Sequence, residues 1–279
     1  MLVIPNSDAG RITRRYSPAN RCIYCGTTSG PLGDEHIIPF AIAGDAAILP
    51  EASCQPCADI NNKIEGPMHR RQLKELRSVI NSPTRRPRDR PKRLSIGLSH
   101  FATFKSGEQA RYLGESEVDV KSFPVSYASL YLDKPGILLG LPLGTPLPWN
   151  VRHHGSFTET SDPFRDGANA ARIGSINPYL TAQYLARIAF AYAVAEEGAG
   201  SFMPLVLDLI TARTSYFRHW VGGDLAIPAA DPASLHLISR RWVKSKGIAY
   251  LVVTLRLFCF LGTPINHVVV GRENGPLSV

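Results

Sequence analysis

Apolar residues at helical spacing and short apolar runs predict the elements of the first third of the chain. A short strand is expected over residues 34–41 and a second over residues 47–52, with the Gly44-Asp45 turn between them. A helix should begin at Cys54, because Ile60, Ile64 and Met68 then repeat at four-residue spacing. Gly66-Pro67 should break this helix or open a second one, whose apolar face is expected within residues 69–80.

The composition changes at Leu94, where we expect a domain boundary. Beyond it, Asn177-Pro178 predicts the start of a helix that ends at Gly198, and Ser201 is expected to cap a further helix over residues 202–220. A Pro/Gly-rich stretch, residues 140–149, is expected as a loop. Strands are expected in pieces over residues 118–132 and then over residues 235–243, 248–260 and 266–272, the last three as an antiparallel meander. The expected fold class is α+β.

Two Cys-x-x-Cys pairs carry the most specific chemical signal, Cys22/Cys25 and Cys54/Cys57. Two thiolates at this spacing can bind one metal ion from a tight turn, and two such pairs complete a tetrahedral zinc site with Zn–S bonds of about 2.3 Å. Four protein thiolates leave no open position on the ion, so this zinc is expected to be structural. The fifth cysteine, Cys259, lies in an apolar strand pattern and is expected to be a buried thiol.

Between the two cysteine pairs lies the run Glu35-His36-Ile37-Ile38-Pro39. An imidazole with an ordinary pKa of about 6.5 is suited to take a proton from water near neutral pH. His36 is therefore the candidate general base, and Glu35 is the carboxylate directly beside it. On a regular strand these two side chains would point to opposite faces, so a bend or bulge is needed to bring them together.

This segment, over roughly residues 20–66, resembles the HNH endonucleases, whose ββα-metal domain carries an acid-His-Ile-Ile-Pro run. The paired cysteines match the branch of that family in which a structural zinc supports the ββα unit. The resemblance implies that His36 is the general base and that Glu35 holds a divalent cation such as Mg²⁺ at the scissile phosphate. Many relatives have a further metal ligand directly after the fourth cysteine, where this chain has Ala58.

Asn62, one helical turn beyond Ala58, and its neighbour Asn61 are the candidates for the second ligand of the catalytic cation. Capping or solvation of the helix is an equally simple role for both amides. Acidic alternatives are found on the same helix and beside Glu35; they are Asp59, Glu65 and Asp34.

The strongest charge run follows the predicted nuclease segment. The residues expected to contact nucleic-acid phosphates are Arg85, Arg86, Arg88, Arg90, Lys92 and Arg93. The alternative is a solvated linker, since Pro83, Pro87 and Pro91 keep the segment extended. A net charge of +8 and a pI near 9.4 favour a polyanionic partner.

These observations predict an HNH-like module over residues 1–80, a basic segment over residues 81–93 and an α+β domain of unknown role over residues 94–279. The expected function is metal-dependent endonuclease activity on nucleic acid, most simply double-stranded DNA. The alternative is a zinc-bearing nucleic-acid-binding or regulatory protein with a degenerate site. The chain has no signal-peptide pattern and no apolar run of about 20 residues, so we expect no membrane association. Thiolate zinc ligands with one spare cysteine fit the reducing cytoplasm.

Overall fold

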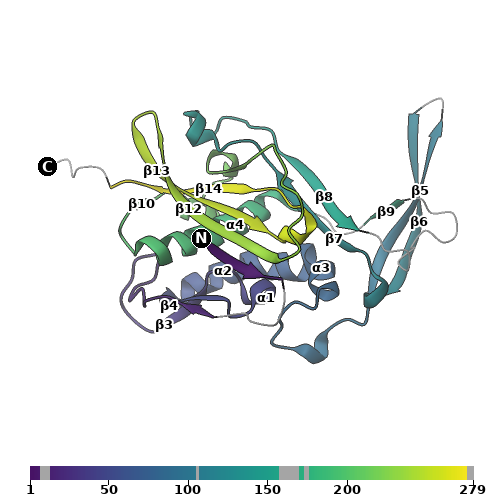
Figure 1. Ribbon diagram of the computed structural model, residues 1–279, viewed down its shortest axis with the longest axis horizontal. Coiled ribbons are helices and arrows are strands. Elements are labelled where there is room, and N and C mark those ends of the chain that lie inside the picture. Colours follow the sequence, from purple (N-terminus) through teal and green to yellow (C-terminus); the bar gives the residue numbers. More distant parts are fainter. Residues whose placement is uncertain (7–12, 105–106, 157–169, 173–175, 275–279) are drawn as a thin grey trace.

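The computed structural model describes residues 1–6, 13–104, 107–156, 170–172 and 176–274 (Figure 1). Within these ranges the chain forms a mixed α/β fold. The α-helices are α1 (Phe40–Ala43), α2 (Gln55–Pro67), α3 (Lys74–Val79), α4 (Pro178–Glu197) and α5 (Leu207–Ile210). A π-helical turn, η1 (Met68–Gln72), joins α2 to α3, and short 3-10 turns include η2 (Pro87–Asp89), η4 (Gly136–Leu139) and η7 (Phe217–His219).

Four sheets are formed within the described residues. The main sheet has the order β1-β12-β13-β14-β10, with β11 also paired to β14, and its strands are β1 (Leu2–Pro5), β10 (Met203–Pro204), β11 (Val221–Gly223), β12 (Ser234–Ser245), β13 (Ile248–Leu257) and β14 (Asn266–Arg272). A small sheet of order β2-β4-β3 contains β2 (Arg14–Arg15), β3 (Leu32–His36) and β4 (Ala47–Cys54). The other two sheets are β6-β5-β9 and β7-β8, with β5 (Arg93–Phe104), β6 (Gly107–Asp119), β7 (Val125–Tyr131), β8 (Asn150–Ser156) and β9 (Ala170–Arg172).

The expected C-terminal meander and the helix before it are confirmed. Strands β12, β13 and β14 pair in antiparallel order. Helix α4 begins where predicted, because the side chain of Asn177 accepts a hydrogen bond from the Leu180 N–H at 3.0 Å. Every residue of α4 from Thr181 to Val194 is buried, as expected of a helix inside a protein. It contacts β13 and β14 of the main sheet and also α2, so it joins that sheet to the N-terminal elements.

The expected helix over residues 202–220 is wrong. Met203–Pro204 instead forms strand β10 on the edge of the main sheet, with Met203 opposite Arg272. The apolar residues that suggested a helix form only the single turn α5. Ala212 then has a positive φ of 60°, which no helix interior tolerates, and the chain continues to η7.

The strand expected over residues 34–41 is observed as β3, which is shorter and begins two residues earlier, at Leu32. Strand β3 ends at His36, and the next two residues, Ile37 and Ile38, are both fully buried, which an alternating strand does not allow. Pro39 then precedes α1. The break expected at Gly66-Pro67 is a change of helix type, since α2 runs directly into η1.

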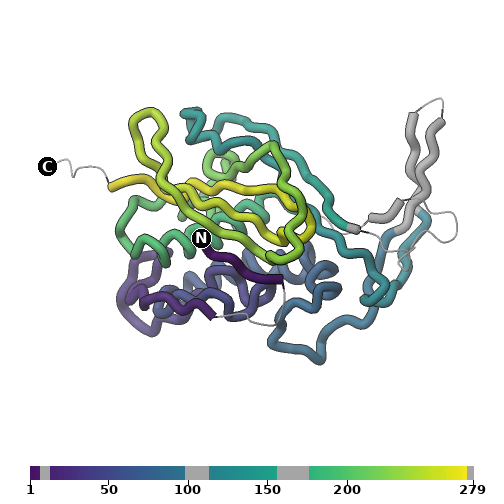
Figure 2. Tube along the Cα trace, in the orientation of Figure 1, coloured from purple at the N-terminus to yellow at the C-terminus, as the bar shows by residue number. Residues whose placement is uncertain are grey.

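One hydrophobic core crosses the boundary expected at Leu94. It contains Ile37 and Leu49 from the small sheet together with Phe190 of α4 and Val253 of β13. The chain path in Figure 2 agrees, since the N-terminal β1 lies beside the C-terminal main sheet and pairs with β12. In the part of the chain that the structure describes, no helix combines the length and apolarity needed to cross a bilayer.

Candidate functional site

The two cysteine pairs converge on one point. The sulfur atoms of Cys22, Cys25, Cys54 and Cys57 all lie within 4.8 Å of one another. Regular tetrahedral coordination with Zn–S bonds of about 2.3 Å requires sulfur atoms about 3.8 Å apart, and the Sγ atoms of Cys25 and Cys54 are 3.7 Å apart. The cluster can therefore hold a tetrahedrally bound metal ion such as zinc.

Local geometry explains why the cysteines meet. In the first pair, the Gly26 N–H donates to the Cys22 carbonyl at 2.8 Å, and Gly26 has a φ of 77°, which closes the turn. In the second pair, Cys54 ends β4 and Cys57 lies in the first turn of α2. Burial alone would raise the pKa of Cys22, but backbone N–H donors, among them that of Cys54, lower it to about 7.

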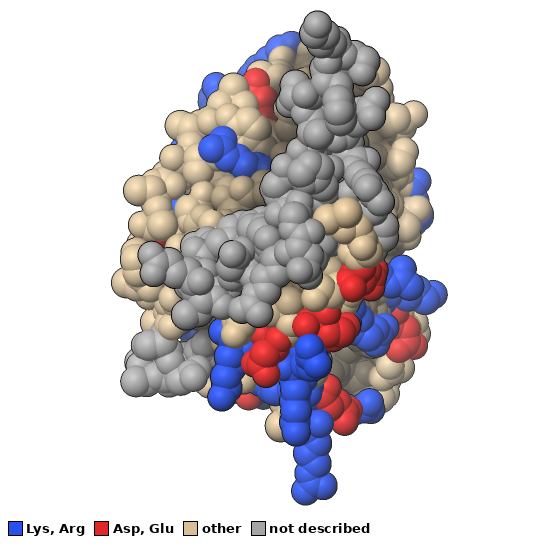
Figure 3. All heavy atoms as spheres, turned by 90° about the vertical axis from the view of Figure 1, so that its right-hand side faces the viewer, with Lys and Arg blue, Asp and Glu red and all other residues tan. Residues whose placement is uncertain are grey.

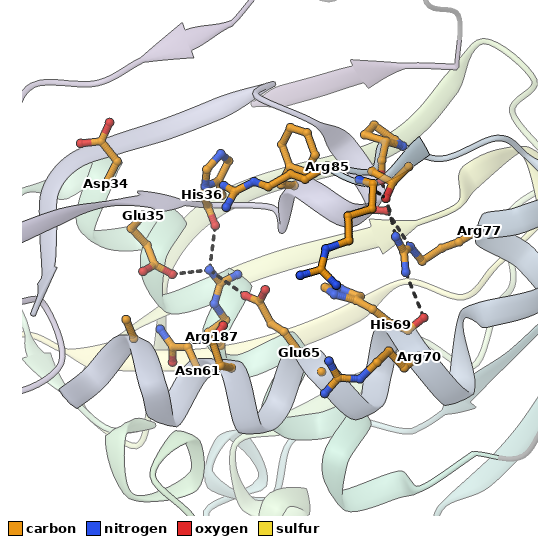
Figure 4. Close-up of a pocket in the computed structure, with 18 residues that line it drawn as sticks. Asp34, Glu35, His36, Asn61, Glu65, His69, Arg70, Arg77, Arg85 and Arg187 are labelled. Atoms are coloured by element: carbon orange, nitrogen blue, oxygen red, sulfur yellow. Dashed lines mark hydrogen bonds and ion pairs between the residues drawn. The ribbon is translucent and has the colours of Figure 1, made fainter. Parts of the chain in front are cut away.

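Most of the predicted catalytic residues line one pocket of about 600 Å³ beside the small sheet (Figure 4). His36 lines it together with candidate acids and amides from β3 and α2. Arginines from α4, η1, α3 and the basic segment complete the lining. The charged residues of the pocket are Asp34, Glu35, Glu65, Arg70, Arg77, Arg85, Arg86 and Arg187. The five guanidinium groups outnumber the three carboxylates, which leaves a net charge of +2 with the histidines neutral. Such a pocket attracts anions.

Glu35 and His36 both face this pocket despite being neighbours on β3. The register between β3 and β4 shifts between Gly33 and Glu35, just before this pair, whereas Glu35 and His36 themselves are opposite Leu49 and Ile48 in regular register. The expected bulge is therefore in β3, but it does not lie between the two residues.

His36 is held by Asp45. Its Nε2 lies 2.9 Å from Asp45 Oδ1, and its ring lies edge-on to Phe40, with 5.9 Å between ring centroids. An ionised carboxylate only accepts hydrogen bonds, so in the neutral form of the ring that pairs with it Nε2 has the hydrogen and Nδ1 has the lone pair. The side chain of His36 is 20% exposed, so water can reach its imidazole ring. This is the arrangement that a general base needs.

Glu35 lies in a buried ion-pair network with Arg187 of α4. The Arg187 Nη2 contacts Glu35 Oε1, lies 3.0 Å from Glu65 Oε1 and donates to the His36 carbonyl at 2.9 Å. Burial alone would lower the pKa of Arg187, but the two carboxylates outweigh it and raise the pKa above its ordinary value. Burial also raises the pKa of Glu65, against the opposing charge of Arg187. Arg187 therefore stays charged and bridges β3 to α2.

Tyr24 completes this network. Its hydroxyl donates to Glu35 Oε1 at 2.9 Å. Burial raises the pKa of Tyr24 well above its ordinary value, and the charge of Glu35 raises it further. Tyr24 and Arg187 both contact Oε1 of Glu35, and among the described residues its Oε2 atom forms no hydrogen bond or ion pair.

The two candidate amides differ in their surroundings. Asn61 is 5% exposed, and neither of its amide atoms has a hydrogen-bond partner among the residues that the structure describes, although the amide lies near enough to Tyr24 to lower that pKa. Asn62 is exposed and lines the same pocket. Of the acidic alternatives, Asp34 pairs with Arg15 at 2.9 Å. Asp59 accepts a hydrogen bond from Gln55 at 2.8 Å and does not line the pocket.

The structure divides the basic run into two groups. Arg85 and Arg86 line the pocket, and the Arg85 guanidinium lies 5.3 Å from the centroid of the Phe40 ring. Arg88, Lys92 and Arg93 are exposed and do not line it, and Arg93 donates to the Glu117 carbonyl at 2.8 Å. On the face in Figure 3, basic side chains gather beside several acidic ones, so that face carries both signs of charge.

Sequence reasoning missed two residues that position the site. Asp45 was assigned only to a turn, although a carboxylate nine residues from the candidate base was a usable signal. Arg187 lies in a helix in which most residues around it in the sequence are apolar. A single arginine in the middle of such a helix was the available signal, but its partners are distant in the sequence, with 151 positions between Arg187 and His36.

Comparison of the chain with protein-family models, with curated proteins and with solved structures finds no match.

Proposed function

We propose that this protein is an endonuclease that hydrolyses nucleic-acid phosphodiester bonds in the pocket beside the small sheet, with DNA as its substrate. The observation that carries the proposal is the His36–Asp45 pair, whose histidine lines a pocket that also holds carboxylates, amides and an excess of arginines. The order β3, β4, α2 around a four-cysteine cluster is consistent with a zinc-supported ββα unit of the HNH type.

His36 acts as the general base in this proposal. As water attacks phosphorus, the new O–P bond forms, the bond to the leaving 3′ oxygen breaks, and the water proton passes to Nδ1 of His36. The Asp45 carboxylate stabilises the resulting imidazolium and keeps the ring oriented. Arg85 and Arg86 contact the phosphate oxygens, whose negative charge increases in the transition state.

The pocket also fits a divalent cation such as Mg²⁺. Glu35 Oε2 and the buried, unpartnered Oδ1 of Asn61 are hard oxygen donors of the kind that Mg²⁺ prefers, and Asn62 and Glu65 lie close by on α2. Such an ion would neutralise charge on the leaving oxygen. The four-cysteine cluster would hold zinc as a structural support only.

One observation favours a second function, that of a non-catalytic nucleic-acid-binding protein. Arg187 already neutralises part of the charge of Glu35 and Glu65. A divalent cation bound there would have a guanidinium as its neighbour, which lowers its affinity.

The test is incubation of plasmid DNA, and separately of RNA, with the purified protein and Mg²⁺, Mn²⁺, Ni²⁺ or no added cation. Cleavage should fall about a hundredfold or more in His36→Ala, the range for loss of a positioned base. His153→Ala is the matched control, because His153 is exposed on β8, away from the pocket. Tight DNA binding with no cleavage under any condition would instead establish the binding function.

A further inference from the structure

A second pocket, of about 420 Å³, lies between η1, α3 and the basic segment. It shares a wall with the first pocket, since both are lined by His69, Arg70, Arg77, Thr84 and Arg86. The residues that line only the second pocket are Lys74, Ser78, Ser82, Asp89, Arg90 and Pro91. Arg86, one of the two arginines proposed above to contact the phosphate, also lines it, whereas His36, Glu35 and Asn61 do not.

The second pocket is strongly positive. Its five cations are Arg70, Lys74, Arg77, Arg86 and Arg90, against the single carboxylate of Asp89. Among the residues that the structure describes, none of these five cations forms an ion pair within 4.0 Å. Burial lowers the pKa of Arg77, and the nearby charge of Arg90 lowers it further. Cations brought together without counter-charges need a bound anion to offset their repulsion.

Two of the cations are fixed in place. Arg77 donates to the carbonyl oxygens of Ala41 at 2.8 Å and His69 at 3.0 Å, and so ties α3 to α1 and η1. Arg90 donates to the Ser82 carbonyl. A site whose charges are already positioned binds an anion without the entropic cost of ordering them.

Ser82 supplies an independent sign of a ligand. It is 5% exposed, it lines this pocket, and within the described parts of the chain its hydroxyl has no hydrogen-bond partner. A buried hydroxyl without a partner costs free energy, and a phosphate oxygen would provide the missing acceptor.

We propose that this second pocket binds a phosphate of the nucleic-acid strand next to the one that is hydrolysed. The proposal rests on the proposed function for its choice of ligand. The two pockets share five lining residues, so neighbouring phosphates of one strand can occupy both. In the first pocket the strand would pass from His36 toward Arg70 and Arg77 (Figure 4). In the second pocket it would continue toward Lys74 and Arg90.

The test measures binding of an oligonucleotide without added divalent cation, so that no cleavage interferes. Lys74→Gln and Ser82→Ala are compared with Arg71→Gln, a matched control, since Arg71 is exposed on η1 and lines neither pocket. Lys74→Gln should make the dependence of log affinity on log salt shallower by about 1, the effect of one lost phosphate contact. Ser82→Ala should weaken binding severalfold while leaving thermal stability unchanged or raised, because its hydroxyl has no partner to lose.

Oligonucleotides carrying one neutral methylphosphonate at successive positions locate the contact. Wild type should lose affinity at two neighbouring positions, and Lys74→Gln should become insensitive to one of them. Equal effects of Lys74→Gln, Ser82→Ala and Arg71→Gln would overturn the proposal. Inorganic phosphate that binds as tightly as the oligonucleotide would overturn it too, because the site would then serve a free anion. If these binding effects are observed but no divalent cation supports cleavage, the phosphate site in the second pocket is supported and the proposed hydrolytic function is refuted.

Discussion

Arg187→Met tests whether the bridge between β3 and α2 supports the candidate site. Methionine fills a similar volume without charge, so the change leaves Glu35 and Glu65 facing each other with no cation between them. It also removes the donor to the His36 carbonyl. Arg187 is 3% exposed and Glu35 is 4% exposed, so solvent cannot replace the lost partner.

The expected cost is large. Removing one partner of a buried ion pair destabilises a protein by about 3–5 kcal/mol, because the remaining charge is buried without compensation. Total stabilities are about 5–15 kcal/mol. For a chain of this size each kcal/mol lowers Tm by roughly 2–4 °C, so Tm should fall by roughly 6–20 °C.

Thermal and urea unfolding followed by circular dichroism measure this cost. Arg240→Met is the matched control, because Arg240 pairs with Glu197 at 2.8 Å but its side chain is 32% exposed. That pair should contribute at most about 1 kcal/mol. The triple variant Arg187→Met, Glu35→Gln, Glu65→Gln removes all three charges and should regain much of the lost stability. A loss in Arg187→Met no greater than that in Arg240→Met would refute the reasoning.

Three further predictions follow from the same structure. Freshly prepared protein should contain one zinc per chain by elemental analysis, and Cys54→Ala should unfold the N-terminal elements; zinc-free protein with an intact fold would contradict this. Asp45→Asn should lower cleavage at least tenfold with unchanged DNA affinity, because an amide no longer stabilises the His36 imidazolium; unaltered cleavage would remove Asp45 from the mechanism. Burial and the charge of Arg77 lower the pKa of His69 to about 3, so its stabilising contribution is complete above pH 6.5, its ordinary pKa, and is lost as the pH falls toward 3. Urea titrations between pH 7 and 4 should therefore show a smaller loss of stability in His69→Gln than in wild type.

Local patterns were sufficient for those parts of the fold that local forces determine. The cap at Asn177 and the apolar repeat that follows it predicted α4, and glycine-bearing turns between apolar runs predicted the meander. The spacing of the cysteines predicted their convergence because each pair closes within a few residues. The expected helix over residues 202–220 failed because pairing of Met203 with Arg272 on the sheet edge outweighed helical spacing.

The candidate site could be predicted only in part, for a related reason. The acid-His run and the helix amides lie within 30 residues and share one small sheet and one helix, so sequence alone brought them to the same site. The positive charge that pairs with Glu35 and Glu65 comes from Arg187, which lies outside residues 20–66. Nothing in residues 20–66 indicates which guanidinium pairs with Glu35, and a buried charge needs such a partner to offset its loss of hydration.

The site therefore depends on more of the chain than its motifs occupy. Arg187 reaches the Glu35–Glu65 pair from α4, which is held against the main sheet, and β1 joins the N-terminus to that same sheet. A fragment ending at Arg93 would keep the four cysteines, His36 and the basic segment, but its two carboxylates would lose their guanidinium. The division into domains at Leu94 stays a prediction. Whether or not the chain divides there, its C-terminal part contributes Arg187 to the candidate site, and no motif in residues 20–66 supplies this positive charge.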